Sequence, residues 1–476
     1  MGSLNATTRW AIWSGLLVGA LITCGGRKPP TLDPPDAPND PNECEGLQCA
    51  IVDCAAKGRP ETSISGTVFA PNGSLQLYGV NVYVPASEVG PLPAGVQCDR
   101  CGTLLGGALA STITDEAGNF VLSGVPATTN VPIVVQVGKW RKQLVLPNVA
   151  ACQDTPIDNA STTLPRTQAE GDIPKIAITT GDADSLECLV RKLGIDDSEF
   201  TASTGAGAVH LYRGNGAQEF AVGFPGGAGA FTDAAPFWDS PEQLATYDIV
   251  MFSCEGEQRI DDLSNDPDLD ATAANVKPQS SLQAVHDYAG LGGRVFMSHW
   301  HNVWIGGDKR DTPPDPNYGI PSWKTIIDWN FAAPIDADLQ LALVDETVPK
   351  GTAFASWLVN VGASTTRDEL TIDETRYTAR SSDPARSERW VYVDPDRSDP
   401  LGKESVQNVL FTTPIEEPAG QRCGKVVFSD MHVASGQSSE PDEPFPGGCN
   451  SDPLTAQEKA LAFIFFDIST CVGTIF

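Results

Sequence analysis

Four apolar segments alternate with helical patterns between residue 173 and the end of the chain, and this alternation constrains the fold more than any other feature. The apolar segments are IPKIAITT (173–180), YDIVMF (247–252), GRVFM (293–297) and GKVVF (424–428). Strands that alternate with helices form a parallel sheet with helices on both faces. We therefore expect residues 170–476 to form a doubly wound α/β domain.

The helical segments carry their own start and stop signals. The helix after the first strand has apolar residues at the i, i+3, i+4 and i+7 positions of one buried face. These residues are Leu186, Leu189, Val190 and Leu193. Asp184 is expected to cap the start of this helix, and Gly194 to close its end. Near the end of the chain, Thr455 and Glu458 have the spacing of a capping box.

Residues 62–165 follow a different pattern, in which apolar and polar residues alternate over short stretches such as SISGTVFAP and YGVNVYVPA. Short alternating strands without a helical pattern are typical of a β-sandwich. Residues 87–110 interrupt this rhythm and are expected to form an inserted loop held by a disulfide. The less regular segment 305–420 is interpreted as an insertion within the α/β domain.

The start of the chain has the features of an export signal. The apolar run 10–23 follows Arg9 and is short for a membrane span. The sequence LITCGG resembles a bacterial lipoprotein box, so we expect residues 1–23 to be removed as a signal peptide and Cys24 to be lipidated. An ordinary secretory signal with an incidental Cys24 is the alternative. Residues 24–61 are interpreted as a Pro- and Asp-rich tether that contains a cysteine cluster.

Both interpretations export the protein. The expected location is the bacterial cell envelope, on the periplasmic side or exposed at the surface. Gly25, in place of an aspartate after the lipidated cysteine, favours the outer membrane. The lipid at Cys24 is then the contact with the membrane, which no segment needs to span.

Charge and cysteine content limit the partners further. The net charge of −30, from 61 acidic and 31 basic residues, argues strongly against nucleic acid as a partner because its phosphates would be repelled. Besides Cys24 there are eleven cysteines, which favour disulfides in an oxidising compartment. Six of them lie in the first third of the chain and can close three bridges, whereas the five later ones leave one thiol over. Cys98 and Cys101 are expected in disulfides rather than in a zinc site.

Polar side chains follow each of the four apolar segments. Ligands of open parallel sheets bind beyond the carboxyl ends of the strands, so we expect these side chains to line one cleft. The candidates for binding or catalysis there are Asp182, Cys254, Glu255, Ser298, His299, His301, Asp430 and His432. Three of the five histidines of the chain are in this set.

These residue types suit two kinds of chemistry. His299, His301 and His432 can bind a divalent metal or transfer protons, since histidine titrates near neutral pH and ligates metals as neutral imidazole. Asp182, Glu255 or Asp430 can orient an imidazole or complete a metal shell. The alternative is that all of these groups only cap strand ends. No organic cofactor is expected.

Three roles are possible for the Cys254 thiol. It is a candidate nucleophile if a histidine or a helix start lowers its pKa. The alternatives are a disulfide to Cys188 and a buried thiol. Nearby, Trp300 and Trp304 are candidates for stacking on a sugar, or else they pack under a loop. The acidic run at 261–270 is interpreted as a solvated loop, with calcium binding as the alternative.

Two family resemblances accompany these patterns. SGTVFAPNGSLQLYGVNVYV followed by TDEAGNFVLSGVP resembles a carboxypeptidase regulatory-like domain. This resemblance implies a transthyretin-type sandwich over 62–165, without peptidase activity.

GGRVFMSHWH and CGKVVFSDMH resemble segments of the ThuA-like family. This resemblance implies the class I glutamine amidotransferase-like fold, which is of the flavodoxin-like type. TIDETRY, with Asp373 and Glu374, is similar to a third segment of that family. The resemblance places His299 at the nucleophile position, so glutaminase activity is not expected. Leader, tether, sandwich and this domain together resemble lipoproteins of myxobacteria.

The sequence thus predicts a lipid-anchored envelope protein that binds a carbohydrate-type ligand. The residues favour this binding role over enzymatic activity. The alternatives are a sugar-processing hydrolase or metal-dependent enzyme that uses His299 and His432, and a purely structural envelope protein. The oligomeric state does not follow from the sequence.

Overall fold

The computed structural model describes residues 44–101, 104, 106–260, 275–308, 315–330, 339–373, 375–395, 405–433 and 443–473. The predicted signal peptide, Cys24, most of the predicted tether, Glu374 and the acidic run 261–270 lie outside the described residues. Within the described part of the chain, no helix has both the length and the apolar character needed to cross a membrane.

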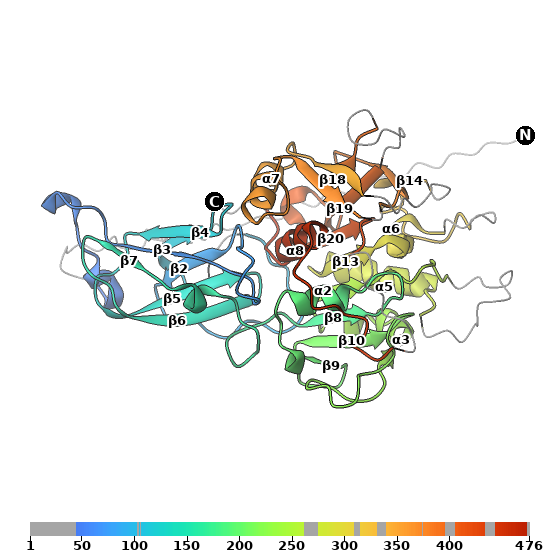
Figure 1. Ribbon diagram of the computed structural model, residues 1–476, viewed down its shortest axis with the longest axis horizontal. Helices are drawn as coiled ribbons and strands as arrows, with labels where there is room; N and C mark the ends of the chain where they lie inside the picture. Colours follow the sequence, from blue (N-terminus) through green and yellow to red (C-terminus); the bar gives the residue numbers. More distant parts are fainter. Residues whose placement is uncertain are drawn as a thin grey trace, which may run out of the picture. The chain divides into compact units, whose positions relative to one another are not determined.

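The described residues between 63 and 156 form two small sheets (Figure 1). One has the order β4-β1-β7, and the other has the order β3-β2-β5-β6. The strands are β1 Ser63–Thr67, β2 Asn81–Pro85, β3 Ala108–Ile113, β4 Asn119–Ser123, β5 Thr129–Val137, β6 Trp140–Asn148 and β7 Asp154–Pro156. Alternate residues of β4 are buried and exposed, as expected for a strand with one face on a core. The transthyretin-type assignment of this region stays a prediction.

The remaining chain forms one large sheet with the order β11-β10-β8-β12-β13-β20-β19-β18-β15-β16. In addition, β9 pairs with β10. Its strands are β8 Ile176–Thr179, β9 Phe200–Ala202, β10 Val209–Arg213, β11 Thr232–Asp233, β12 Ile249–Phe252, β13 Arg294–Ser298, β15 Gln340–Val344, β16 Glu369–Ile372, β18 Glu388–Val393, β19 Ser405–Thr413 and β20 Gly424–Ser429. A separate pair is formed by β14 Ile327–Trp329 and β17 Ala379–Ser382.

This sheet is mixed, which corrects the prediction of a parallel one. The strands from β11 to β20 pair in parallel, whereas β19, β18, β15 and β16 are antiparallel. The antiparallel strands come from the segment 305–420 and from the chain directly before β20, where short connections favour antiparallel pairing. The α/β class itself is correct, because helices accompany the parallel part.

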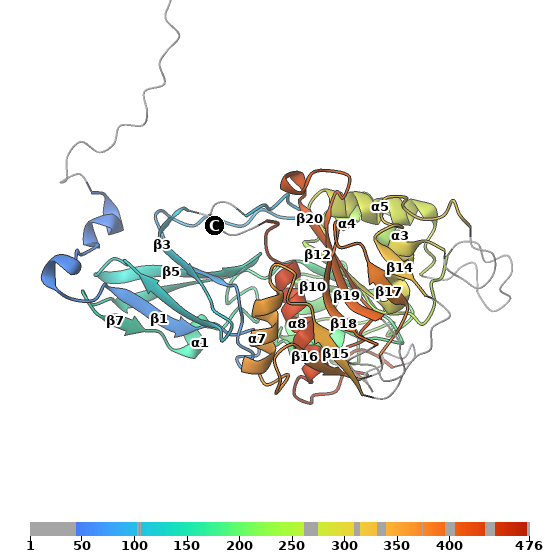
Figure 2. The ribbon, with the colours of Figure 1, turned by 90° about the horizontal axis from the view of Figure 1, so that it is seen from above.

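Helices cover both faces of the parallel strands (Figure 2). Inward residues of one face, such as Ile176, Met251 and Phe296, belong to a cluster shared with α2 and α8. The alternate residues, such as Val250 and Val295, belong to a second cluster shared with α3 and α5. Strands buried on both faces explain why the sequence showed continuous apolar runs.

The α-helices are α1 Asn159–Thr162, α2 Leu186–Lys192, α3 Ala234–Trp238, α4 Pro241–Leu244, α5 Gln279–Gly290, α6 Val303–Gly306, α7 Gly351–Asn360 and α8 Ala456–Ile468. The 3-10 helices are η1 Gly46–Ala50, η2 Ala55–Lys57, η3 Asp197–Glu199, η4 His299–Asn302 and η5 Ala419–Gln421. The capping box of Thr455 and Glu458 at α8 is confirmed. The predicted cap of α2 by Asp184 is wrong, because Ser185 occupies the N-cap and the Asp184 carboxylate has other partners.

The disulfides connect distant parts of the chain. The bridges are Cys54–Cys152, Cys98–Cys423, Cys101–Cys471 and Cys188–Cys449, and Cys44 and Cys49 are also disulfide-bonded. The predicted disulfides of Cys98 and Cys101 are confirmed, but their partners lie in the last third of the chain. Six early cysteines therefore do not close three bridges among themselves. The alternative bridge between Cys188 and Cys254 is wrong, and Cys254 is the free thiol among the described cysteines.

A buried ion-pair cluster joins α8 to the sheet and to α7. Asp467 of α8 contacts the ammonium groups of Lys350 and Lys425, and the Lys425 Nζ–Asp467 Oδ2 distance is 3.3 Å. These two cations lower the pKa of Asp467 to about 2 despite its burial, so the carboxylate is ionised at neutral pH. Burial lowers the pKa of Lys425 to about 8.

We predict that Asp467→Ala lowers the free energy of unfolding by about 3–5 kcal/mol, because it leaves Lys425 buried without its counter-charge. The control is Asp233→Ala, which removes the partly exposed ion pair of Asp233 with Arg213 and should cost less than about 1 kcal/mol. Urea unfolding with the disulfides intact measures both. Equal losses in the two variants would contradict the role of the cluster.

Candidate functional site

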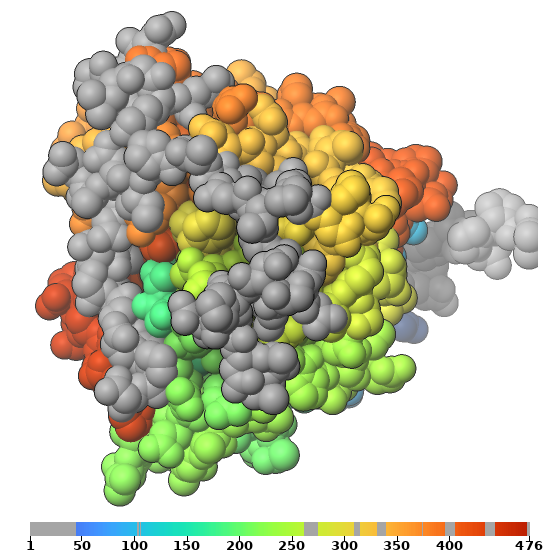
Figure 3. Space-filling model, turned by 90° about the vertical axis from the view of Figure 1, so that its right-hand side faces the viewer, coloured from blue at the N-terminus to red at the C-terminus, as the bar shows by residue number. Residues whose placement is uncertain are grey.

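The register of the parallel strands places the residues that follow them at corresponding positions along one edge of the sheet. Phe252 of β12 pairs with Met297 of β13, and Met297 pairs with Phe428 of β20. Two residues further along each strand stand Cys254, His299 and Asp430. On the face of the molecule seen in Figure 3, segments from the middle of the chain lie beside segments from its last third.

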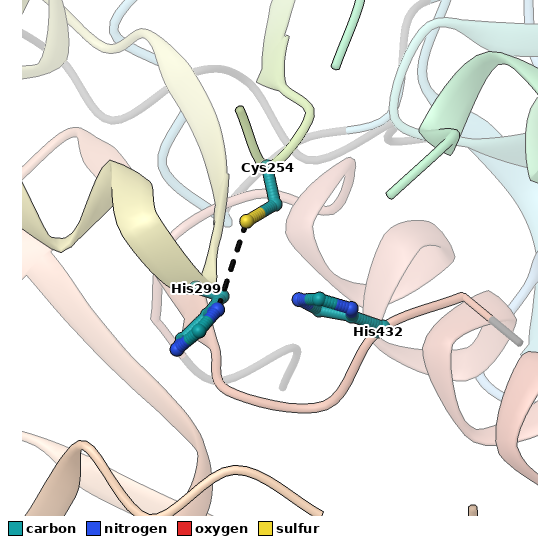
Figure 4. A group of neighbouring side chains, drawn as sticks. All are labelled: Cys254, His299 and His432. Carbon is teal, nitrogen blue, oxygen red and sulfur yellow. Dashed lines mark hydrogen bonds between the residues drawn. The ribbon is translucent and has the colours of Figure 1, made fainter. Parts of the chain in front are cut away.

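His299 is the first residue of η4 and stands at the sharp turn that follows β13. Its φ is +30°, in the left-handed region that residues with a side chain rarely adopt. The turn points the ring toward Cys254, and the Cys254 Sγ–His299 Nδ1 distance is 3.6 Å. Figure 4 shows this contact, with the His432 ring directed at the space beside it.

Cys254, His299 and His432 form a three-residue cluster. One potential ligand atom from each residue lies within 4.8 Å of the other two. The rings of His299 and His432 have centroids 5.2 Å apart. Exposed fractions are 0% for Cys254, 2% for His299 and 4% for His432, so the cluster is buried. Among the described residues, no hydrogen-bond partner meets Nε2 of either histidine.

Two buried aspartates flank the cluster. Oδ1 of Asp430 lies 3.8 Å from Nε2 of His299. The Asp430 carboxylate also accepts hydrogen bonds from the Thr378 backbone and hydroxyl, at 2.8 and 2.5 Å. Asp184 accepts from the Ser298 hydroxyl and from the Val433 backbone, the latter at 2.7 Å. Burial raises the pKa of each aspartate to about 6, against these hydrogen bonds, which lower it.

Burial also holds the cluster in its uncharged form. It raises the pKa of the Cys254 thiol to about 12, against backbone N–H groups of Trp300 and Gly256 that favour the thiolate. Burial, together with the positive charge of Arg376, lowers the pKa of His299 to about 3. The pKa of His432 is lowered well below its usual range by burial, by His299 and by Arg376. At neutral pH the site therefore has a protonated thiol and two neutral imidazoles.

Two predicted site residues belong to the core instead. His301 uses both ring nitrogens, because Nε2 lies 2.8 Å from the Ser253 carbonyl oxygen and Nδ1 accepts from Trp304 Nε1 at 2.8 Å. It has no nitrogen left for a metal. Trp304 is buried and its ring stacks on Phe252, so it presents no face to a sugar. Here the alternative of an aromatic packed under a loop describes the structure.

The other predicted residues surround the cluster at varying distance. Glu255 is buried in an ion pair with Lys277 at 2.5 Å and accepts from Asn275. Asp182 is half-buried and accepts from Asn215 at 2.7 Å. Ser298 donates to Asp184, as described above. Trp300 is half-buried beside His299, with ring centroids 5.0 Å apart.

Arg376, Thr378 and Gln457 are site residues that the sequence analysis missed. Nη2 of Arg376 lies 3.4 Å from Nδ1 of His432. The Gln457 side chain donates to the His432 carbonyl oxygen at 2.5 Å, which fixes the turn after β20. Arg376 lies within the TIDETRY segment, so the family resemblance was the only signal that pointed to its surroundings.

The donor set fits a metal ion of the zinc class. Zinc binds cysteine sulfur and histidine nitrogen, and three protein ligands leave one position open in catalytic sites. The imidazoles are already neutral, as ligation requires, and only the thiol must lose a proton. Asp430 lies on the Nε2 side of His299, where a carboxylate at hydrogen-bond distance would orient a ligating imidazole, but the 3.8 Å separation is longer than a hydrogen bond.

Comparisons with known proteins give weak similarities. No protein-family model and no curated protein matches the chain. A ThuA-like protein from Bacteroides uniformis is 12% identical over 63% of this chain and 90% of its own, with a TM-score of 0.28. A cytoplasmic protein from Salmonella typhimurium is 12% identical over 55% and 89%, with a TM-score of 0.26. At these scores the family resemblances of the sequence stay predictions.

The buried, protonated thiol predicts slow alkylation. In the native protein with chelator present, we expect iodoacetamide to modify Cys254 at pH 8 roughly 10³-fold more slowly than in the unfolded chain, from the thiolate fraction alone. Peptide mapping by mass spectrometry measures the rates, and Cys254→Ser identifies the peptide. Native labelling at the rate of an unfolded cysteine would contradict the buried thiol.

Proposed function

We propose that this protein binds one transition-metal ion of the zinc class through Cys254, His299 and His432, and that it is a metal-dependent enzyme. The observation that carries the proposal is the convergence of one thiol and two imidazoles, from the ends of three parallel strands, within 4.8 Å of one another. The two histidines were the sequence-based candidates for a metal-dependent enzyme, and the thiol adds the third ligand.

The orientation of the His299 ring supports Nδ1 as its ligand atom. Nδ1 faces the sulfur, so the ring proton belongs on Nε2, 3.8 Å from the Asp430 carboxylate. At 3.8 Å the two groups are not hydrogen-bonded, and an approach of the carboxylate to hydrogen-bond distance would fix the tautomer and the ring orientation. For His432, ligation through Nε2 puts the ring proton on Nδ1, so the guanidinium of Arg376 must move away from its 3.4 Å contact.

An unpartnered buried nitrogen and two nearby carboxylates support a bound cation. Buried polar atoms without partners are costly, at about 1–3 kcal/mol each, and Nε2 of His432 is such an atom among the described residues. Asp184 and Asp430 add negative charge nearby, which a dication offsets. When bound, such an ion supplies a water molecule with a pKa near 7, suited to hydrolysis.

We predict that the purified protein takes up about one equivalent of Zn²⁺, measured by elemental analysis after dialysis. Cys254→Ser, His299→Ala and His432→Ala should each weaken the affinity by at least about 100-fold, since even loss of an outer partner costs 10–100-fold. With Co²⁺ as the probe, a sulfur-to-cobalt charge-transfer band should appear in the wild type and vanish in Cys254→Ser.

The matched control is His286→Ala. His286 lies on α5 and has Asp287 and Glu416 as partners, so its loss should leave uptake unchanged. A wild-type protein that takes up neither metal, or a His286→Ala variant that loses uptake like His299→Ala, would refute the proposal.

Thiol catalysis is the second candidate. The line from Cys254 Sγ to His299 Nδ1, and from His299 Nε2 to Asp430, has the order of nucleophile, base and orienting acid. The raised pKa of the thiol and its burial argue against this chemistry. Rapid native alkylation of Cys254 in the experiment above would favour it over the metal centre.

A carbohydrate-type ligand also stays a proposal. Of the two tryptophans that suggested it, only Trp300 is partly exposed. A panel of sugars tested on the metal-loaded protein distinguishes a hydrolase from a binding protein. A hydrolase alters a sugar that it binds, whereas a binding protein leaves it unchanged. A protein that binds neither sugar nor metal fits the structural role.

We propose in addition that the protein is exported and anchored through Cys24. The disulfides of the described residues support an oxidising compartment. In a bacterial host, the full chain should incorporate labelled palmitate and sediment with membranes, and Cys24→Ala should abolish both. Cys254→Ala is the control. Unlabelled wild-type protein in the soluble periplasmic fraction would favour the ordinary secretory signal.

A further inference from the structure

The buried carboxylate of Asp184 bridges the two chain segments that carry the histidines. It comes from the turn between β8 and α2, and accepts hydrogen bonds from the Ser298 hydroxyl and the Val433 backbone N–H. Ser298 directly precedes His299, and Val433 directly follows His432. One side chain from a third strand end therefore ties the residues next to both proposed ligands.

We infer that Asp184 is the positioning residue of the metal centre, because it sets the separation of His299 and His432. This inference rests on the proposed metal site. Ligand geometry must hold to within about 0.5 Å for tight binding. The two histidines follow the neighbouring strands β13 and β20, whose pairing ends at Ser298 and Ser429. Beyond that point, the Asp184 carboxylate forms hydrogen bonds that span both turns.

The surroundings of Asp184 support this role over a purely local one. Its side chain does not cap α2, the helix that it precedes. It is buried, and each of its oxygens has one of the two partners. The turn itself is held against β12, since the Ala183 N–H donates to the Cys254 carbonyl oxygen at 3.1 Å. Asp184 is thereby anchored to the segment of the third ligand as well.

The test compares Asp184→Ala with Asp182→Ala. Asp182 lies in the same turn, but its carboxylate accepts from Asn215 and not from the histidine segments. We expect Asp184→Ala to weaken Co²⁺ affinity by about 10–100-fold and to change the ligand-field spectrum. Asp182→Ala should do neither.

Two further variants separate positioning from folding. Asp184→Asn keeps an oxygen for the Val433 N–H and an amide that can donate to the Ser298 oxygen, so it should recover most of the affinity. Ser298→Ala removes one of the two bonds and should give an intermediate loss. The double variant Asp184→Ala/Ser298→Ala should bind no more weakly than Asp184→Ala alone.

A metal-free measurement keeps the inference independent of the proposed function. In protein labelled with ¹⁵N-histidine, Asp184→Ala should shift the ring signals of His299 and His432 and leave that of His286 in place. If the wild type binds no metal but these shifts occur, the proposed function fails and the positioning role stands. If Asp184→Ala matches Asp182→Ala in the histidine signals and in Co²⁺ binding, the inference is wrong. If Asp184→Ala does not fold, the same comparison is made with Ser298→Ala.

Discussion

The parallel register of β8, β12, β13 and β20 is the constraint on which the site depends. It places Cys254, His299 and Asp430 at corresponding positions, two residues beyond paired strand residues. Side chains alternate along a strand, so a slip of one residue between two of these strands would send the corresponding side chains to opposite faces of the sheet. Gly181 tightens the same arrangement, because a Cβ there would lie 2.1 Å from the Cys254 carbonyl oxygen and would push the ends of β8 and β12 apart.

Periodicity predicted the parts of the fold that depend on local burial. The apolar runs before Cys254, His299 and Asp430 are strands, since a strand covered on both faces must be apolar at every position. Periodicity did not predict which side chains meet beyond those strands. His299 adopts a left-handed conformation and the chain enters a 3-10 turn, so the period of two no longer applies and His301 points into the core.

Contacts between distant segments could not be predicted from the sequence patterns, for a different reason. The Cys98–Cys423 and Cys101–Cys471 bridges span 325 and 370 residues, and spacing carries no information on such pairings. Arg376 and Thr378 come from a segment without clear periodicity, yet they contact His432 and Asp430. The mixed sheet has the same origin, because the antiparallel strands of that segment add to an edge that the parallel pattern does not specify.

The balance of charge around the cluster decides which kind of ligand suits it. The nearby Asp184 and Asp430 carboxylates would repel an anion. The same carboxylates would attract a dication, and Cys254, His299 and His432 would offer it three lone pairs. Arg376 opposes the dication, and its positive charge already lowers the pKa of both histidines. Ionisation of Cys254 adds the compensating negative charge at the sulfur itself, where attraction to the ion is strongest. Metal binding and loss of the thiol proton are therefore coupled, and the affinity should rise with pH for as long as the thiol supplies that proton.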